Sequence, residues 1–124
     1  MSYPVYKLIH FLGIFTVIAA LVAAGIHVLR GGTRANDPYR KVISAAHGIA
    51  AFLILLGGFG MLARLGILSG GGGLPGWIIV KLVIWVAVGA LMALPYRGPK
   101  FARLVLIALP VLLLGAAATA LYKP

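Results

Sequence analysis

The first long apolar run of the chain, KLIHFLGIFTVIAALVAAGIHVLR from Lys7 to Arg30, limits the fold more than any other feature. Each end carries a basic residue and, three positions further in, a histidine: Lys7 precedes His10, and His27 precedes Arg30. No charged residue lies between the histidines. A helix over this run would be about 35 Å long, which exceeds the ~30 Å hydrocarbon thickness of a bilayer. The run therefore predicts a helix that crosses a membrane.

The composition of the whole chain points the same way. Of its 124 residues 63% are hydrophobic and 10% are charged, against roughly 45–50% and 25% in soluble domains. This excludes a soluble protein and predicts an integral membrane protein in contact with the lipid bilayer. The absence of cysteine excludes disulfides and thiolate metal sites. The net charge of +10 comes from basic residues that flank apolar runs, so it predicts membrane topology and lipid headgroup contacts, with no nucleic-acid partner.

Four apolar runs predict four transmembrane helices, over about 5–29, 38–65, 76–96 and 99–121. Asp37 is expected to cap the second helix, with Pro38 at its first position. The segments SGGGGLPG (69–76) and YRGPK (96–100) predict a flexible loop and a tight turn. Short connections make successive helices antiparallel neighbours. The fold class expected is therefore all-α, a single transmembrane domain over 1–124 that forms an up-down-up-down four-helix bundle.

The distribution of Lys and Arg predicts the orientation of this bundle. Seven of them flank the first and third connections: Arg30, Arg34, Arg40, Lys41, Arg97, Lys100 and Arg103. Three flank the opposite side: Lys7, Arg64 and Lys123. Because cytoplasmic loops carry the excess of basic residues, both termini are expected on the outer, periplasmic side of a bacterial inner membrane.

Two histidines are expected at a similar depth on the cytoplasmic side. His27 lies about one turn inside the first helix, and His47 lies roughly two turns inside the second. Two facing histidines can ligate haem iron axially, with Arg30 available to a propionate. Two histidines hold zinc poorly, because zinc sites take three or four ligands. The alternative is that His27 is an interfacial histidine hydrogen-bonded to a loop carbonyl.

A second pair of polar residues is expected in the outer half. His10 lies about one turn inside the first helix, and Lys81 about one turn inside the third. Asp37 is the only acidic residue of the chain, so a lysine at this depth would extend to the interface, lose its proton or meet an external anion. Helical geometry separates His10 from His27 by ~260°, which predicts two separate sites or one site and one idle histidine.

Small residues favour close helix contacts in the same region. The first helix carries a stripe that includes Gly13 and Ala20, and the second contains the run GGFG (57–60). Small residues let backbones approach and would equally leave room for a flat cofactor. Because each glycine costs a helix roughly 1 kcal/mol relative to alanine in water, some packing or ligand contact should compensate.

These motifs together resemble a known group of proteins. The features are KLIH opening the first helix, HVLR closing it, His47 before a glycine-rich segment, and Trp77-x-x-x-Lys81 opening the third helix. They look like the SirB family of small bacterial membrane proteins. More distantly they resemble the HemJ-type protoporphyrinogen oxidases and the CopD-like four-helix proteins. The resemblance implies bound haem b, with His10 and Lys81 at the positions of the hallmark helix-1 histidine and helix-3 lysine.

Two classes of function follow, and a third, a purely structural or regulatory partner, stays open because the sequence gives no sign for or against it. One is a haem b or tetrapyrrole protein in electron transfer or porphyrin oxidation, with His10, His27 and His47 as candidate iron ligands and Arg30 and Lys81 as further cofactor-binding residues. The other is a non-enzymatic transporter, channel or accessory membrane subunit that forms homo-oligomers through its small-residue faces. In that case Lys81 would recruit an anionic solute or a lipid headgroup.

Overall fold

The computed structural model describes residues 2–69 and 73–122. Within these residues it is all-helical, and it has four long helices: α1 (Tyr3–Leu29), α2 (Arg40–Arg64), α3 (Gly76–Ala90) and α4 (Pro99–Tyr122). Three short 3-10 helices lie in the connections, at Ile67–Ser69 (η1), Leu91–Ala93 (η2) and Pro95–Arg97 (η3). Each of α1, α2, α4 and the continuous segment Gly76–Arg97 is long and apolar enough to cross a membrane. The prediction of an all-α chain with four such segments is confirmed.

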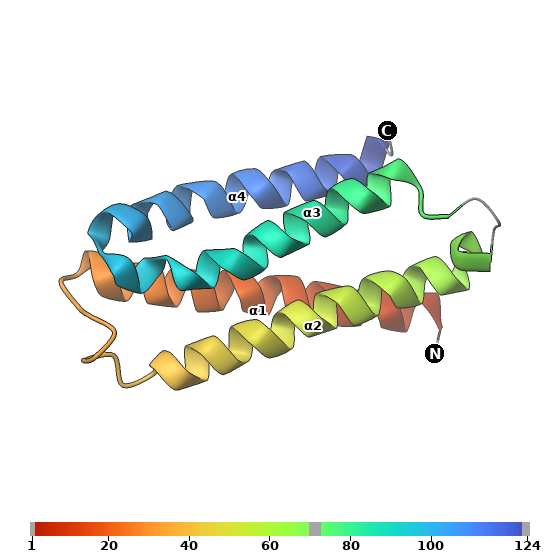
Figure 1. The fold of residues 1–124 in the computed structure, drawn as a ribbon. Helices are drawn as coiled ribbons and strands as arrows, with labels where there is room; N and C mark the ends of the chain where they lie inside the picture. Colours follow the sequence, from red (N-terminus) through yellow and green to blue (C-terminus); the bar gives the residue numbers. More distant parts are fainter. Residues whose placement is uncertain (1, 70–72, 123–124) are drawn as a thin grey trace.

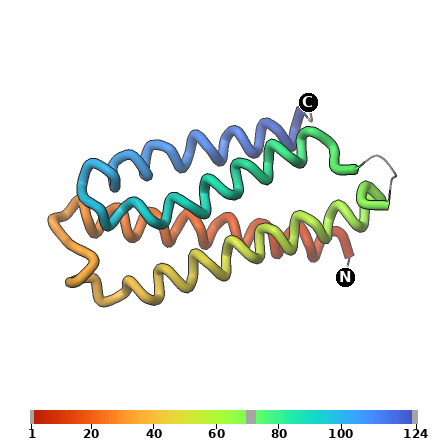
Figure 2. The backbone as a smooth tube through the Cα atoms, viewed as in Figure 1, coloured from red at the N-terminus to blue at the C-terminus, as the bar shows by residue number. Residues whose placement is uncertain are grey.

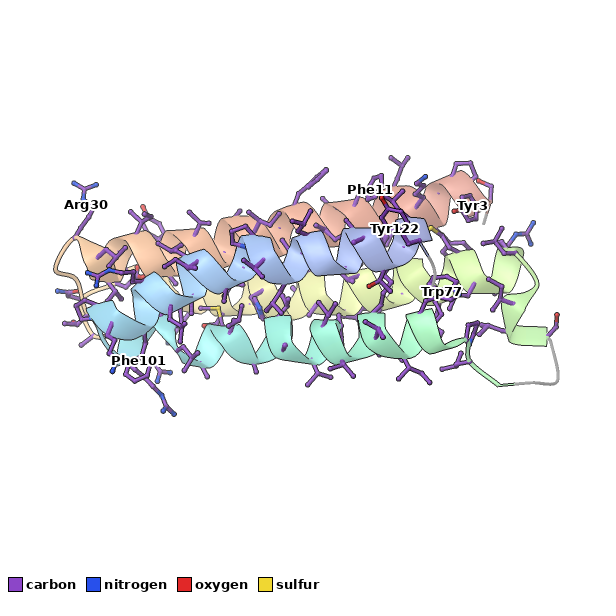
Figure 3. All side chains as sticks on the ribbon, turned by 90° about the horizontal axis from the view of Figure 1, so that it is seen from above. Tyr3, Phe11, Arg30, Trp77, Phe101 and Tyr122 are labelled. Atoms are coloured by element: carbon purple, nitrogen blue, oxygen red, sulfur yellow. The ribbon has the colours of Figure 1, made fainter. Side chains whose placement is uncertain are left out.

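The helices lie lengthwise beside one another in an elongated bundle (Figures 1 and 2). α1 contacts both α2 and α4, and α3 packs mainly on α4. Figure 3 places Tyr3, Trp77 and Tyr122 toward one end of the bundle, and Arg30 and Phe101 toward the other. Helices α1 and α4 thus form the centre of the bundle, because each contacts two of the other three long helices.

Helix α2 begins later than the sequence predicted. It starts at Arg40 rather than at Pro38, and its N-cap is Tyr39, which makes no side-chain cap bond. The expected cap from Asp37 is wrong. Asp37 Oδ1 instead accepts the Tyr39 N–H at 2.9 Å, while its other oxygen is bound to Tyr96. The carboxylate is therefore held in the turn before the helix rather than over its first turn.

Helix α3 ends earlier than predicted. It was expected to run to 96, but it stops at Ala90 and continues as η2 and η3. The reason is Pro95, which lacks an N–H and whose ring would clash in an α-helix with the carbonyl four residues earlier. Gly98 then takes a φ of 148°, a backbone conformation that favours glycine, and the chain turns into Pro99.

The remaining boundaries agree with the sequence to within two residues, apart from segments outside the described part of the chain. The first helix was expected over 5–29 and the last over 99–121, and the structure has Tyr3–Leu29 and Pro99–Tyr122. Residues 70–72 of the predicted loop over 69–76, and Lys123, lie outside the described residues.

The core is a thin apolar seam between the helices, formed by a cluster to which α1, α2, α3, η2 and α4 all contribute. Its buried members are Val17, Leu21, Ala50, Val88, Leu91, Val105 and Leu109. Many large apolar side chains are exposed on the outward faces, among them Leu8, Phe15, Phe52, Val83, Ile107 and Leu114. In water such a surface would be unfavourable, whereas in a bilayer it contacts lipid. The chain is therefore a multi-pass membrane protein.

Candidate functional site

His10 is one of the few buried polar residues of the bundle. Its side chain is 8% exposed, and its Nδ1 lies 2.8 Å from the carbonyl oxygen of Ile54 on α2. Because a carbonyl oxygen can only accept, Nδ1 carries the proton and donates it. The neutral imidazole then has its lone pair on Nε2. The contact with α2 thus determines the tautomer of His10 and the nitrogen that is available as a base or a ligand.

Glycines of α2 allow the close approach that this bond requires. A methyl group at Gly57 would lie 2.5 Å from the His10 backbone nitrogen and 2.6 Å from the Tyr6 carbonyl oxygen. On α1, a methyl group at Gly13 would lie 2.6 Å from the Ala50 carbonyl oxygen. The two backbones are therefore in direct contact at both glycines, as in small-residue packing of transmembrane helices. This packing accounts for the GGFG run.

Lys81, the second residue of the predicted outer pair, lies on α3 and is half-buried. Gly58 of α2 flanks the His10 ring, since a methyl group there would lie 3.6 Å from Cε1 and from Nδ1. His10 therefore lies where α1 packs against the glycine-rich segment of α2.

His47 has a different role, in the contact between α2 and α3. Its Nε2 donates to the Val88 carbonyl oxygen at 3.3 Å. In the reverse direction, the Trp85 indole N–H of α3 donates to the Ala51 carbonyl oxygen of α2 at 2.9 Å. These two bonds cross the same helix pair, so His47 and Trp85 join α2 to α3 through backbone oxygens.

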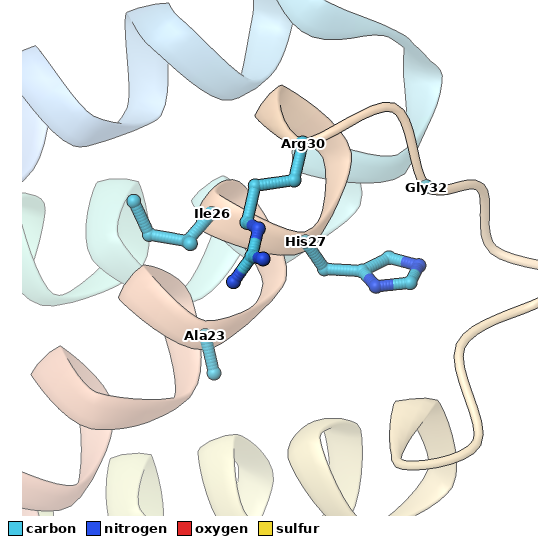
Figure 4. A pocket seen from close by; sticks show the side chains of 5 residues that line it. All are labelled: Ala23, Ile26, His27, Arg30 and Gly32. Atoms are coloured by element: carbon cyan, nitrogen blue, oxygen red, sulfur yellow. The ribbon is translucent and has the colours of Figure 1, made fainter.

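His27 is held by the first loop rather than by another helix. Its Nε2 donates to the Thr33 carbonyl oxygen at 2.9 Å and to Asn36 Oδ1 at 3.0 Å. The ring projects toward the loop (Figure 4), beside a cavity of about 370 Å³. The cavity is lined by Ala23, Ile26, His27, Arg30 and Gly32. The Arg30 side chain is exposed and folds back along α1 toward Ala23 and Ile26 (Figure 4).

His27 and His47, the inner pair predicted as haem ligands, each use Nε2 in a hydrogen bond. Because both Nε2 atoms donate protons to oxygens, the lone pair of each neutral ring is on Nδ1. The accepting oxygens lie in different parts of the fold: the partner of His27 is in the first loop, and the partner of His47 is in α3. His10 differs, because its Nδ1 makes the hydrogen bond and its Nε2 carries the lone pair. Among residues 2–69 and 73–122 there is no group of three or more His, Cys, Asp or Glu that could hold a metal ion.

A hydrogen bond that the sequence analysis missed connects the first loop to η3. The Tyr96 hydroxyl donates to Asp37 Oδ2 at 2.6 Å across 59 positions of sequence. This bond lowers the pKa of the Asp37 carboxyl below its usual 3.8, assisted by the Tyr39 N–H and opposed by burial. The only signal in the sequence was that Asp37 is the sole acid, which did not indicate its partner.

Comparisons of the chain with protein-family models, with curated proteins and with solved structures found no match.

Proposed function

We propose that this protein is a haem b-binding protein of the bacterial inner membrane, with His10 as the iron ligand. The bundle would have up-down-up-down topology with both termini on the periplasmic side. Two observations support this orientation: Tyr3 and Tyr122 lie toward the same end of the bundle (Figure 3), and the basic residues are concentrated at the first and third connections. The resemblance to the SirB and HemJ-type proteins supports the cofactor.

The observation that carries this proposal is the bond from His10 Nδ1 to the Ile54 carbonyl oxygen. Metal-ligating histidines almost always donate their other ring N–H to a carboxylate, a backbone carbonyl or water, which fixes the tautomer and makes the ligating nitrogen more basic. His10 has this arrangement, with Nε2 as the ligating nitrogen.

Lys81 would hold a propionate of the cofactor. Lys81 lies in the second turn of α3, and an ammonium in a low-dielectric site binds a carboxylate strongly. Bound haem b would supply one-electron chemistry, suited to electron transfer or porphyrin oxidation. The protein would hold the cofactor through His10 as the iron ligand and through Lys81 at a propionate carboxylate.

The test is haemin titration of the detergent-purified protein, followed by absorbance before and after reduction. We expect sharp Soret and α bands at about one haem per chain for the wild type. His10→Gly should abolish them, and added imidazole should restore them by replacing the missing ligand. His47→Ala and His27→Ala are the matched controls and should keep the bands. Lys81→Met should weaken haem binding by about tenfold or more.

Two results would contradict this proposal. One is a wild-type protein that remains colourless at saturating haemin. The other is a His10→Gly variant with an unchanged spectrum. If His47→Ala or His27→Ala abolished the bands instead, the inner pair would be the ligand set in place of His10.

The second candidate is a non-enzymatic transporter, channel or accessory subunit, in which Lys81 binds an anionic solute or lipid headgroup. One observation favours it: His10, His27 and His47 each bond to a backbone oxygen, which is how histidines act in a purely structural role. If this candidate is right, the purified protein shows no haem absorbance bands. It also predicts that Lys81→Met reduces anion or lipid binding while His10→Gly, if folded, does not.

A further inference from the structure

A second cavity lies at the opposite end of the bundle from His10 and has a distinct chemistry. It measures about 310 Å³ and is lined by Arg34, Arg40, Lys41 and Ser44. Three of these four residues are cations and the fourth offers a hydroxyl. The proposed haem site does not use any of them.

The geometry of the cavity comes from two elements. Arg40 and Lys41 begin α2, and Ser44 follows one turn later, so the three side chains share one side of the helix. Arg34 approaches from the first loop. That loop is held by the Thr33 N–H donating to Asn36 Oδ1 at 2.7 Å, and by His27, which donates to the same amide oxygen. The loop therefore positions Arg34 opposite the helix.

The only acidic side chain nearby is already bound to other donors. Asp37 accepts the Tyr39 N–H through Oδ1 and the Tyr96 hydroxyl through Oδ2. It is also the single acid of the chain. Three cations converging on one cavity repel each other, and an anion inside it would remove this repulsion. Guanidinium groups, an ammonium and a hydroxyl are the donors that phosphate oxygens accept from.

The cavity also lies at the depth where phosphate groups are found. Arg40 is the first residue of a membrane-spanning helix, so the cavity is at the boundary between the apolar span and the polar loop. Lipid phosphates lie in this zone, and each Lys or Arg near it contributes to the attraction of anionic lipid. We propose that this cavity binds a phosphate group, either in an anionic lipid headgroup or as the free ion.

The experiment measures phosphatidylglycerol binding to the detergent-solubilised protein by native mass spectrometry, with phosphatidylcholine as the neutral reference. We expect one phosphatidylglycerol per chain, bound about tenfold more tightly than phosphatidylcholine. Replacing Arg34, Arg40 and Lys41 by Gln should weaken this binding on the order of a hundredfold. The matched control replaces Arg97, Lys100 and Arg103 by Gln. It removes the same number of charges from the same predicted side and should change binding less than about threefold.

A third variant tests the cavity without changing charge. Ser44→Phe places a large side chain at an exposed position of the lining, and it should weaken phosphatidylglycerol binding about tenfold with all cations retained. Competition by millimolar inorganic phosphate would identify the free ion as a ligand, and its absence would identify the lipid headgroup. Equal losses in the two triple variants would overturn the proposal, because diffuse surface charge would then explain binding. Unaltered binding in Ser44→Phe, or no preference for phosphatidylglycerol, would also overturn it.

Discussion

The two ends of α1 each carry a histidine, and their surroundings differ in kind. His10 is buried and bonds to Ile54, 44 positions away on another helix. His27 is half-buried and bonds to Thr33 and Asn36, six and nine positions away. The first bond joins two helices, while the second shapes a loop. The same residue type thus acts in tertiary packing toward one end of α1 and in local structure toward the other.

The packing of α2 differs between the same two ends. Gly57 lies against the α1 backbone near His10, whereas Gly48, near the start of α2, has nothing within 4 Å of an added methyl group. Helix α2 is therefore in direct contact with α1 around Gly57 and has no such contact at Gly48. A chemically selective site needs fixed geometry, and a surface site for an anion needs access. The two proposed sites follow this division.

The largest expected effect is at the packed end. Gly57→Ala forces a methyl group against the backbone of α1, which cannot move without separating the helices, so we expect a loss of about 3 kcal/mol in the free energy of unfolding. Gly48→Ala is the matched control and should gain about 1 kcal/mol from helix propensity. Unfolding in mixed micelles, followed by circular dichroism, measures both. Equal stabilities of the two variants would mean that the α1–α2 contact is looser than described.

The second-largest expected effect is the difference in unfolding free energy between the variants of His10 and of His27. His10→Ala removes a buried hydrogen bond between helices and should cost about 2 kcal/mol, whereas His27→Ala removes a partly exposed loop contact and should cost about 0.5 kcal/mol. The same unfolding measurement applies to both variants. A larger loss for His27→Ala would reverse the comparison and make the first loop the more important element for stability.

A smaller effect is expected at Asp37. Its pKa is lowered from 3.8 in the folded state, so its stabilising contribution is complete above about pH 4 and is lost as the pH falls through the lower folded value. Tyr96→Phe removes the main cause of the shift and should raise this pKa toward 3.8. The stability difference between wild type and variant should therefore shrink on acidification. Tyr39→Phe is the control, because Tyr39 binds Asp37 only through its backbone N–H. A difference independent of pH would contradict the assignment.

The smallest effect is expected within the first loop. Asn36→Ala removes the oxygen shared by the Thr33 N–H and the His27 ring, but both contacts are exposed, so we expect a loss below about 1 kcal/mol. Hydrogen exchange should nevertheless become faster at the Thr33 amide, with no change at amides around Gly57. Faster exchange at both places would show that the loop and the packed end are coupled.

Several features of this protein follow from sequence alone. Four apolar runs, separated by glycine, proline and basic residues, specify four membrane-spanning segments, because the bilayer thickness fixes the length such a run must have. The depth of a residue in the membrane also follows from its position along the helix. The sequence therefore predicted that His10 and Lys81 lie at a similar depth, and this stays a prediction.

The tertiary structure alone decided the direction in which each side chain points. Apolar residues cover all sides of these helices, so periodicity does not distinguish the lipid-facing side from the packed side. The rotation of each helix depends instead on close contacts such as Gly57 against α1. That rotation separates His27 from His47 into different hydrogen-bond networks. It also brings Tyr96 to Asp37 across 59 positions, a pairing of two polar groups that no local pattern encodes.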